Sequence, residues 1–262
     1  MAPPKPATPV TLPAKLPPTP TKDSLDDIRK RGVLRACIAP YAPWAIAGEN
    51  DAWTSFSVNI ARQLAEDLSV QVSFMPGRYG DLLQRVAEGE CDLVPSGLAP
   101  TPDRALFVHF SRPTTTHDIA IVADKAAAAE WKGLADLDRS DIALGVVQDS
   151  VEASDAKRAF PKATLMPFPD HQELTAALQL GKLKALVAAS PLPDILMKQA
   201  PDKLTLVARS PIAHRSEALA VRRGDLEFLA FLNDWIQART DDGWLKARAD
   251  QWFENLDWAT DK

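Results

Sequence analysis

Residues 33–38 read VLRACI, and residues 56–68 read FSVNIARQLAEDL. The first stretch is short and almost wholly apolar, as is typical of a buried strand. The second has Ile60, Leu64 and Leu68 at the spacing of one helical face. Read in the same way, the following chain predicts strands at 33–38, 70–74 and 91–95, and helices at 56–68 and 81–88. This alternating order predicts a parallel sheet with helices on its faces.

A second set of elements repeats this pattern. Strands are expected at 142–147, 164–167 and 184–188, and helices at 150–160, 171–180 and, near the end, 225–238. Extended stretches at 113–116, 119–122 and 217–222 connect the two sets. The chain therefore predicts an α/β clamshell of two lobes, each a mostly parallel sheet flanked by helices, joined by two hinge crossings. A ligand would be buried between the lobes, and closure of the lobes would exclude water from it.

The expected domain boundaries follow from these elements. Lobe 1 should hold residues 24–115 and 222–262, and lobe 2 should hold residues 116–221 with the crossings. Residues 1–23 are rich in proline and poor in large apolar side chains, which predicts a disordered, extended tail. The tail is either a tether between an anchor and the folded part or a remnant of cloning or processing.

Composition limits the classes of partner. A net charge of −5 and an isoelectric point near 5.4 argue against nucleic acid or an anionic membrane as the main partner. Two cysteines and four scattered histidines show no metal-ligand spacing, so we expect neither a metal nor a cofactor. The start of the chain lacks the apolar core of a secretion signal, which is also what a processed protein would show.

The loop Ser96-Gly97-Leu98-Ala99-Pro100-Thr101-Pro102-Asp103-Arg104 follows a predicted strand. Its two closely spaced prolines restrict the backbone and argue against a regular strand or helix across them. A guanidinium at the end of such a stiff loop can serve as a bidentate anchor for a carboxylate. A solvated arginine in a surface turn is the alternative.

A series of short motifs runs through the chain in a characteristic order. They are Gly32-Val33-Leu34-Arg35, Tyr41-Ala42-Pro43-Trp44, Phe56-Ser57-Val58-Asn59-Ile60-Ala61, residues 97–104, Phe110-Ser111-Arg112-Pro113, Gly145-Val146-Val147-Gln148, Ala220-Val221-Arg222-Arg223-Gly224-Asp225, Phe231-Leu232-Asn233-Asp234-Trp235-Ile236 and Asp242-Gly243. Together they resemble the extracytoplasmic solute-binding proteins of the amino-acid-binding type, family 3, which serve ABC importers. The resemblance covers residues 25–258 and implies the type II periplasmic binding fold.

The resemblance also implies a ligand site in lobe 1. The family's arginine, which pairs with the ligand's α-carboxylate, falls on Arg104. Head-group contacts fall on Ser96, Gly97 and Ala99, and Ala99 replaces the usual hydroxyl residue. The two aromatic positions that stack on the ligand fall on Tyr41 and Tyr79, for which packing in the core is the alternative. Trp44 and Trp53 are expected mainly in the core.

In lobe 2 the chain departs from the family's pattern. The turn that meets the carboxylate reads Asp149-Ser150-Val151, and Asp149 or Ser150 is first expected to cap the next helix. The aspartate that binds the ligand's α-ammonium is replaced in this chain by Ala189, which makes an ordinary α-amino acid doubtful as the ligand. Asp149 could supply the charge from another direction. His117 and Asp118 indicate a more polar cleft, whereas His171 and His214 are expected at the surface or as caps.

The cysteines can also be interpreted through the resemblance. Cys37 and Cys91 fall in the first and third strands of one lobe, which can be neighbours, so either a disulfide or two buried thiols is expected. A related branch, the partners of quinoprotein alcohol dehydrogenases, looks similar in having cysteines at these places.

The leading hypothesis is a monomeric periplasmic protein that binds a small carboxylate-bearing solute and delivers it to the permease of an ABC importer. The second is an accessory protein of a periplasmic quinoprotein dehydrogenase, with a degenerate cleft. A remote third is a dehydratase of prephenate-like acids, which needs an acid where Ala189 stands. We therefore expect a binding protein and not an enzyme.

Overall fold

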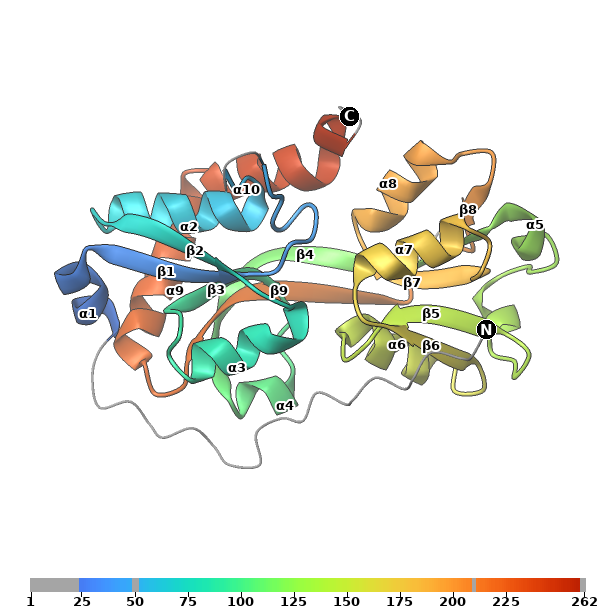
Figure 1. The fold of residues 1–262 in the computed structure, drawn as a ribbon, viewed down its shortest axis with the longest axis horizontal. Helices are drawn as coiled ribbons and strands as arrows, with labels where there is room; N and C mark the ends of the chain where they lie inside the picture. The colour runs from blue at the N-terminus through green and yellow to red at the C-terminus, as the bar shows by residue number, and fades with distance from the viewer. Residues whose placement is uncertain (1–23, 49–51, 209–210, 260–262) are drawn as a thin grey trace. The chain divides into compact units, whose positions relative to one another are not determined.

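The computed structural model describes residues 24–48, 52–208 and 211–259 (Figure 1). These residues form two compact units. The terminal unit holds the described residues up to Thr116 and those from Ser216 onward, and the central unit runs from His117 to Arg215. The tail expected at 1–23 lies outside the described residues.

The terminal unit contains a four-strand arrangement in the order β2-β1-β3-β9. Its strands are β1 (Val33–Ile38), β2 (Gln71–Pro76), β3 (Leu93–Leu98) and β9 (Ala213–Arg222). Its helices are α1 (Ser24–Arg31), α2 (Phe56–Asp67), α3 (Leu82–Ala87), α4 (Pro102–Ala105), α9 (Leu226–Asp241) and α10 (Trp244–Ala249). β1 pairs in parallel with β2 and β3, as the sequence predicts, whereas β9 is antiparallel to β3.

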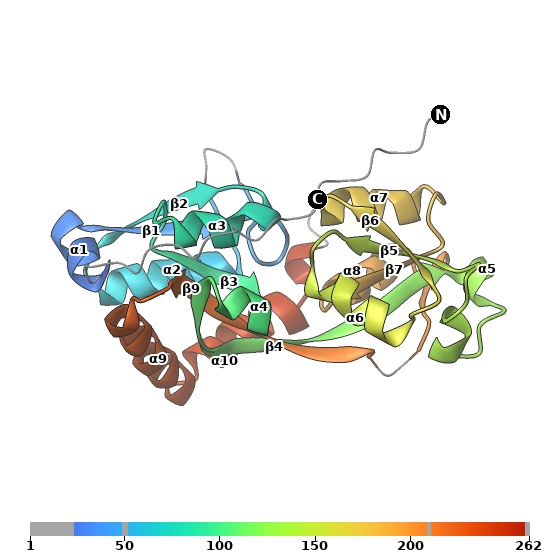
Figure 2. The same ribbon diagram turned by 90° about the horizontal axis from the view of Figure 1, so that it is seen from below.

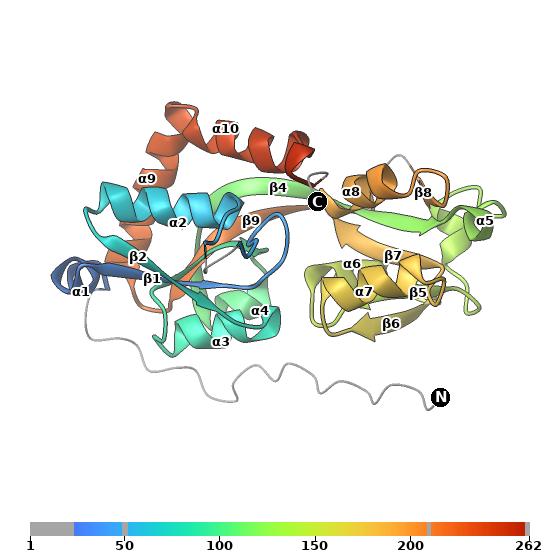
Figure 3. The same ribbon diagram turned by 45° about the horizontal axis from the view of Figure 1, so that its top comes forward.

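Helices α2 and α3 cover opposite faces of this sheet (Figure 3). Leu34 and Ala36 of β1 pack in one core with Ile60 of α2. Cys37 packs on the other side with Val86 of α3. Because side chains alternate between the faces of a strand, the apolar run VLRACI is buried on both sides.

The central unit has the strand order β4-β7-β5-β6, with β8 also paired to β4. Its strands are β4 (Val108–Asp124, shared with the terminal unit), β5 (Ala143–Val147), β6 (Thr164–Phe168), β7 (Ala185–Ala189) and β8 (Leu204–Leu206). Its helices are α5 (Lys125–Ala128), α6 (Val151–Ala159), α7 (His171–Gln179) and α8 (Leu192–Gln199). β5 is parallel to β6 and β7, and β4 is antiparallel to β7.

Helices α6 and α7 flank the strands of the central unit (Figure 2). Leu144 and Val146 of β5 share a core with Ala156 of α6. Between them, Gly145 lets α7 approach closely, because a Cβ at this position would lie 2.6 Å from Leu174 Cδ1 and 2.2 Å from Leu183 Cδ2. A larger residue would therefore force the side chains of Leu174 and Leu183 to shift.

The expected elements are confirmed with small shifts in their ends, and the differences are confined to short helices, one short strand and the joined strand β4. Pro102 begins the one-turn helix α4, which corrects the expectation of an irregular loop, because proline is compatible with the first helical position. The extended pieces around residue 116 form one strand, β4. Helices α1, α5, α8 and α10 and strand β8 were not expected. Among the described residues, no helix is long and apolar enough to cross a membrane.

Candidate functional site

The loop that carries the predicted anchor begins at an irregularity in β3. Val94 pairs with Ala220 and Leu98 with Ala218, so the intervening part of β3 is longer than the part of β9 opposite it. Gly97 lies here with a φ of 82°, a left-handed conformation that favours glycine. Such bulges reorient the chain locally, and here the bulge separates the loop from regular pairing. Ser96 lies in the same segment of β3.

Both predicted tyrosines lie in this part of the terminal unit. Tyr79 Oη donates a hydrogen bond to the Gly97 carbonyl oxygen at 3.1 Å. Tyr41 stacks on Trp44, with ring centroids 4.8 Å apart and planes 13° apart. A Cβ at Gly97 would lie 3.2 Å from Trp44 Cδ1, so the indole packs directly against the loop. The rings of Tyr41, Trp44 and Tyr79 therefore lie around Gly97, and we call these three rings the aromatic cluster.

Arg104 is half-buried on α4 and folds back onto its own loop. Its Nη1 donates to the Ala99 carbonyl oxygen at 3.0 Å, and its backbone N–H donates to Thr101 Oγ1 at 3.3 Å. Thr101 caps α4, so the cap and the guanidinium both hold the loop in one conformation. Ala99 is buried. Its methyl side chain forms no hydrogen bond, so Ala99 can contribute polar contacts only through its backbone N–H and carbonyl.

Sequence reasoning missed Glu217, a buried carboxylate behind the aromatic cluster. Trp44 Nε1 donates to Glu217 Oε2 at 2.6 Å, and both residues are less than 8% exposed. Glu217 lies on β9, one residue before the partner of Leu98. This hydrogen bond fixes the plane of the indole against which Tyr41 stacks. No local motif marks Glu217, because its partner lies 173 residues away in the chain.

In the central unit, the turn before α6 contains a helix cap and a left-handed residue. Ser150 caps the helix: its Oγ accepts from the Ala153 N–H at 3.1 Å and donates to the Val147 carbonyl oxygen at 2.8 Å. Asp149 has a φ of 59°, a left-handed conformation that favours glycine and that aspartate adopts more readily than most other residues. Val151 is buried. The expectation that Ser150 caps the helix is confirmed.

Ala189 ends β7 and lies in the apolar core of the central unit, 6% exposed. His117 is buried, and His214 is exposed on β9 with its Nδ1 2.5 Å from Asp118 Oδ1.

His171 begins α7, where burial lowers its pKa to about 4 although nearby Asp170 acts in the opposite direction. Trp53 packs with Ile38 in the terminal unit's core.

A polar cavity lies elsewhere in the terminal unit, between α1 and the turn at Gly89. Its lining includes Arg31, Arg35, Asp92 and Arg222. Asp92 accepts from Arg31 Nη2 at 2.6 Å, from Arg35 Nη2 at 2.8 Å and from the Arg35 backbone N–H at 2.7 Å. Asp92 thus pairs with Arg31 and Arg35, while Arg222 Nη2 donates to Ser24 Oγ at 3.0 Å. These contacts join α1 to the sheet, so we assign them a structural role.

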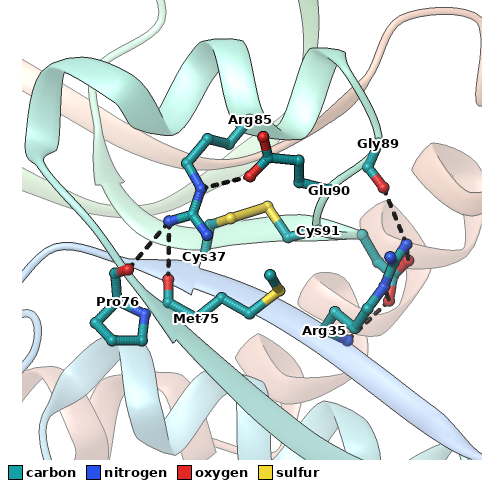
Figure 4. Close-up of a disulfide and its surroundings, with 9 residues drawn as sticks. Arg35, Cys37, Met75, Pro76, Arg85, Gly89, Glu90 and Cys91 are labelled. Carbon is teal, nitrogen blue, oxygen red and sulfur yellow. Dashed lines mark hydrogen bonds and ion pairs between the residues drawn. A yellow bond between two sulfur atoms is a disulfide. The ribbon is translucent and has the colours of Figure 1, made fainter.

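Cys37 and Cys91 form a disulfide, with an S–S distance of 2.13 Å (Figure 4). The predicted bridge is therefore confirmed, and the alternative of two free thiols is wrong. Cys91 lies just before β3, next to β1, which carries Cys37. Arg85 lies nearby, donating to the carbonyl oxygens of Met75 and Pro76 and pairing with Glu90 (Figure 4). The described residues contain no cluster of metal-ligating side chains.

Comparison with known proteins supports this architecture. The model of the bacterial extracellular solute-binding proteins, family 3, matches residues 34–255. The L-cystine-binding protein TcyJ of Escherichia coli K12 is 24% identical over 230 residues, which is 87% of this chain and 85% of TcyJ. The cyclohexadienyl dehydratase of Pseudomonas aeruginosa is 22% identical over 231 residues, 88% of this chain and 86% of the enzyme.

A solved structure adds a likeness in three dimensions. The ancestral amino acid-binding protein AncCDT-1, described as a precursor of cyclohexadienyl dehydratase, is 30% identical, with a TM-score of 0.80. The match covers 88% of this chain and all of that one. The relatives thus include both binding proteins and an enzyme. With the family model matching most of its length, this chain belongs to the bacterial extracellular solute-binding proteins, family 3.

Proposed function

We propose that this protein is the periplasmic substrate-binding component of an ABC importer and that it binds an amino acid through Arg104. The observation that carries the proposal is the Arg104 loop, which is held against an aromatic cluster by its own hydrogen bonds. A guanidinium fixed in this way presents a fork suited to a carboxylate. The binding of L-cystine and of amino acids by the relatives TcyJ and AncCDT-1 supports the class of ligand.

In the proposed mechanism, the terminal unit binds first and no covalent chemistry occurs. Arg104 binds the ligand carboxylate, the backbone at Ser96, Gly97 and Ala99 binds its head group, and the rings of Tyr41 and Tyr79 contact its side chain. The protein would act as a monomer and pass the ligand to a membrane permease.

The test begins with a thermal-shift screen of amino acids, keto acids, aromatic acids and polyamines, followed by calorimetry on the best ligand. We expect Arg104→Ala to weaken binding by at least about 30-fold, because removing one partner of a buried charged pair costs about 2–5 kcal/mol. Arg104→Lys keeps the charge but loses the planar fork, so its affinity should lie between those of the wild type and of Arg104→Ala.

The matched control is Arg29→Ala, at an exposed arginine on α1, which should leave affinity unchanged. Wild-type affinity in Arg104→Ala would contradict the carboxylate anchor. If no compound in the screen binds, the importer role is wrong, and an accessory role with a degenerate cleft becomes the better hypothesis. Turnover of a prephenate-like acid would instead establish an enzyme of the dehydratase type.

A further inference from the structure

The polar cavity beside α1 contains one arginine that differs from its neighbours in its partners. Asp92 binds Arg31 Nη2 through Oδ2 at 2.6 Å and Arg35 Nη2 through Oδ1 at 2.8 Å. Arg222 lines the same cavity. In the described part of the chain, its guanidinium donates to the neutral hydroxyl of Ser24 and to no carboxylate. The contacts that join α1 to the sheet therefore leave the charge of Arg222 unbalanced.

The Nε of Arg222 is a buried donor on this guanidinium. Among the described residues, no atom accepts a hydrogen bond from it. A buried polar group of this kind is commonly satisfied by water or by an ion. Because the guanidinium is a fixed planar fork, Nε and a terminal nitrogen can donate together to one oxyanion.

The turn at Gly89 keeps space beside the Arg222 guanidinium. Gly89 has a φ of 78°, and a Cβ at this position would lie 3.1 Å from Arg222 Nη1. Its carbonyl oxygen accepts from Arg35 Nη2 at 3.1 Å, which holds the turn in place (Figure 4). The cavity has a volume of about 50 Å³, enough for a few water molecules or one small anion.

The charges around the cavity favour an anion over a cation. The lining contains three arginines and two aspartates, Asp27 and Asp92, which leaves one positive charge in excess. Asp92 is already bound by two of the arginines. Asp27, in the first turn of α1, opposes an anion and should limit its affinity. The side chains of Arg31 and Arg35 are 34% and 33% exposed, so the cavity is accessible to an ion from solvent.

We propose that this cavity binds a small inorganic oxyanion, such as phosphate or sulfate, through Nε and a terminal nitrogen of Arg222. The site adjoins Asp92, just before β3, whereas the loop that carries Arg104 follows β3. The two sites therefore lie at opposite ends of that strand, and the proposal does not depend on the solute-binding function. Because Arg222 ends β9 and its partner Ser24 begins α1, the anion stabilises the attachment of α1.

The experiment titrates the full chain with inorganic phosphate or sulfate at constant ionic strength, with chloride as the reference salt. Calorimetry should show saturable binding of one phosphate per chain with a Kd below about 10 mM. At ten times this Kd, the melting temperature should exceed that in chloride by at least about 2 °C. General effects of phosphate and sulfate on stability are measured in Arg222→Gln, where they persist without the guanidinium.

Variants at the cavity separate the anion site from its structural contacts. Arg222→Gln should weaken phosphate binding by at least about tenfold, and Arg222→Lys, which keeps the charge without the fork, should weaken it less. Ser24→Ala is the matched control, because it removes the structural contact and keeps the guanidinium, so its affinity should stay within about threefold of the wild type. Asp27→Asn should tighten binding by about three- to tenfold, because it removes the opposing charge.

Three results would overturn the proposal. The first is the absence of saturable phosphate and sulfate binding, which would assign the cavity to water. The second is wild-type phosphate affinity in both Arg222 variants. The third is binding that Arg104→Ala abolishes and Arg222→Gln retains, which would place the anion at the solute site.

Discussion

At the scale of single residues, Asp149 shows backbone strain at a predicted contact. Its φ of 59° places a Cβ where glycine is preferred. Asp149→Ala should therefore be less stable than Asp149→Gly by about 1 kcal/mol, measured by urea unfolding. The order should reverse at neighbouring Gln148, whose φ is not positive, because glycine there only adds chain entropy. Equal stability of the two Asp149 variants would contradict the strain.

His171 gives a second prediction at this scale. Burial lowers its pKa to about 4, so between pH 6.5 and 4 the unfolded chain binds a proton that the folded protein excludes. Stability should be constant above this window and fall within it as the pH decreases, by about 1–3 kcal/mol for a half-buried ring. Urea unfolding at several pH values should show this slope in the wild type. His171→Gln should flatten it, and an unchanged slope would assign the effect to other groups.

Residues differ in how far their roles could be predicted. The family resemblance implies ligand contacts at Arg104, Tyr41 and Tyr79, and that role stays a prediction; the structure shows that Tyr79 and Arg104 both hydrogen-bond to the loop at 97–99. The pairings of Glu217 and Asp118 could not be predicted, because their partners Trp44 and His214 are distant in sequence. A buried or paired carboxylate is recognised only after strand pairing brings the partners together.

At the scale of elements, the turn that carries Tyr41 and Trp44 is attached to β9 through Glu217. Glu217→Ala should lower the free energy of unfolding by about 2–4 kcal/mol, because the buried indole N–H loses its acceptor and a cavity forms. Glu217→Gln retains an acceptor and should cost less. Exposed Glu254→Ala is the control and should lie within about 0.5 kcal/mol of the wild type. Equal stability of all three variants would show that the turn does not depend on β9.

Elements with a strong apolar period, such as α2 and β1, were predicted nearly to the residue. Helix α8 was missed because Pro191 and Pro193 make its start resemble a loop. Both prolines fall at the beginning of the helix, where the missing N–H groups have no helical partner. The antiparallel pairing of β9 with β3 was also beyond local pattern, because it joins residues more than 100 positions apart.

At the scale of the whole molecule, both cysteines lie in the terminal unit, so the disulfide stabilises only one of the two units directly. The bridge closes a loop with a sequence separation of 54 residues, and reduction should lower that unit's unfolding free energy by about 4 kcal/mol. Tryptophan fluorescence separates the units, because Trp131 belongs to the central unit and the other tryptophans to the terminal unit.

Urea unfolding with and without a reductant therefore tests this division. We expect reduction to lower the midpoint of the total fluorescence change, which the terminal unit dominates. The Trp131 signal is obtained by subtracting the fluorescence change of Trp131→Phe from that of the wild type. Its midpoint should not change on reduction if the two units unfold separately. Cys37→Ala/Cys91→Ala should reproduce the reduced protein and respond no further to reductant. An unchanged midpoint of the terminal unit would contradict the stabilising role of the disulfide, whereas a shared shift would show that the units unfold as one cooperative body.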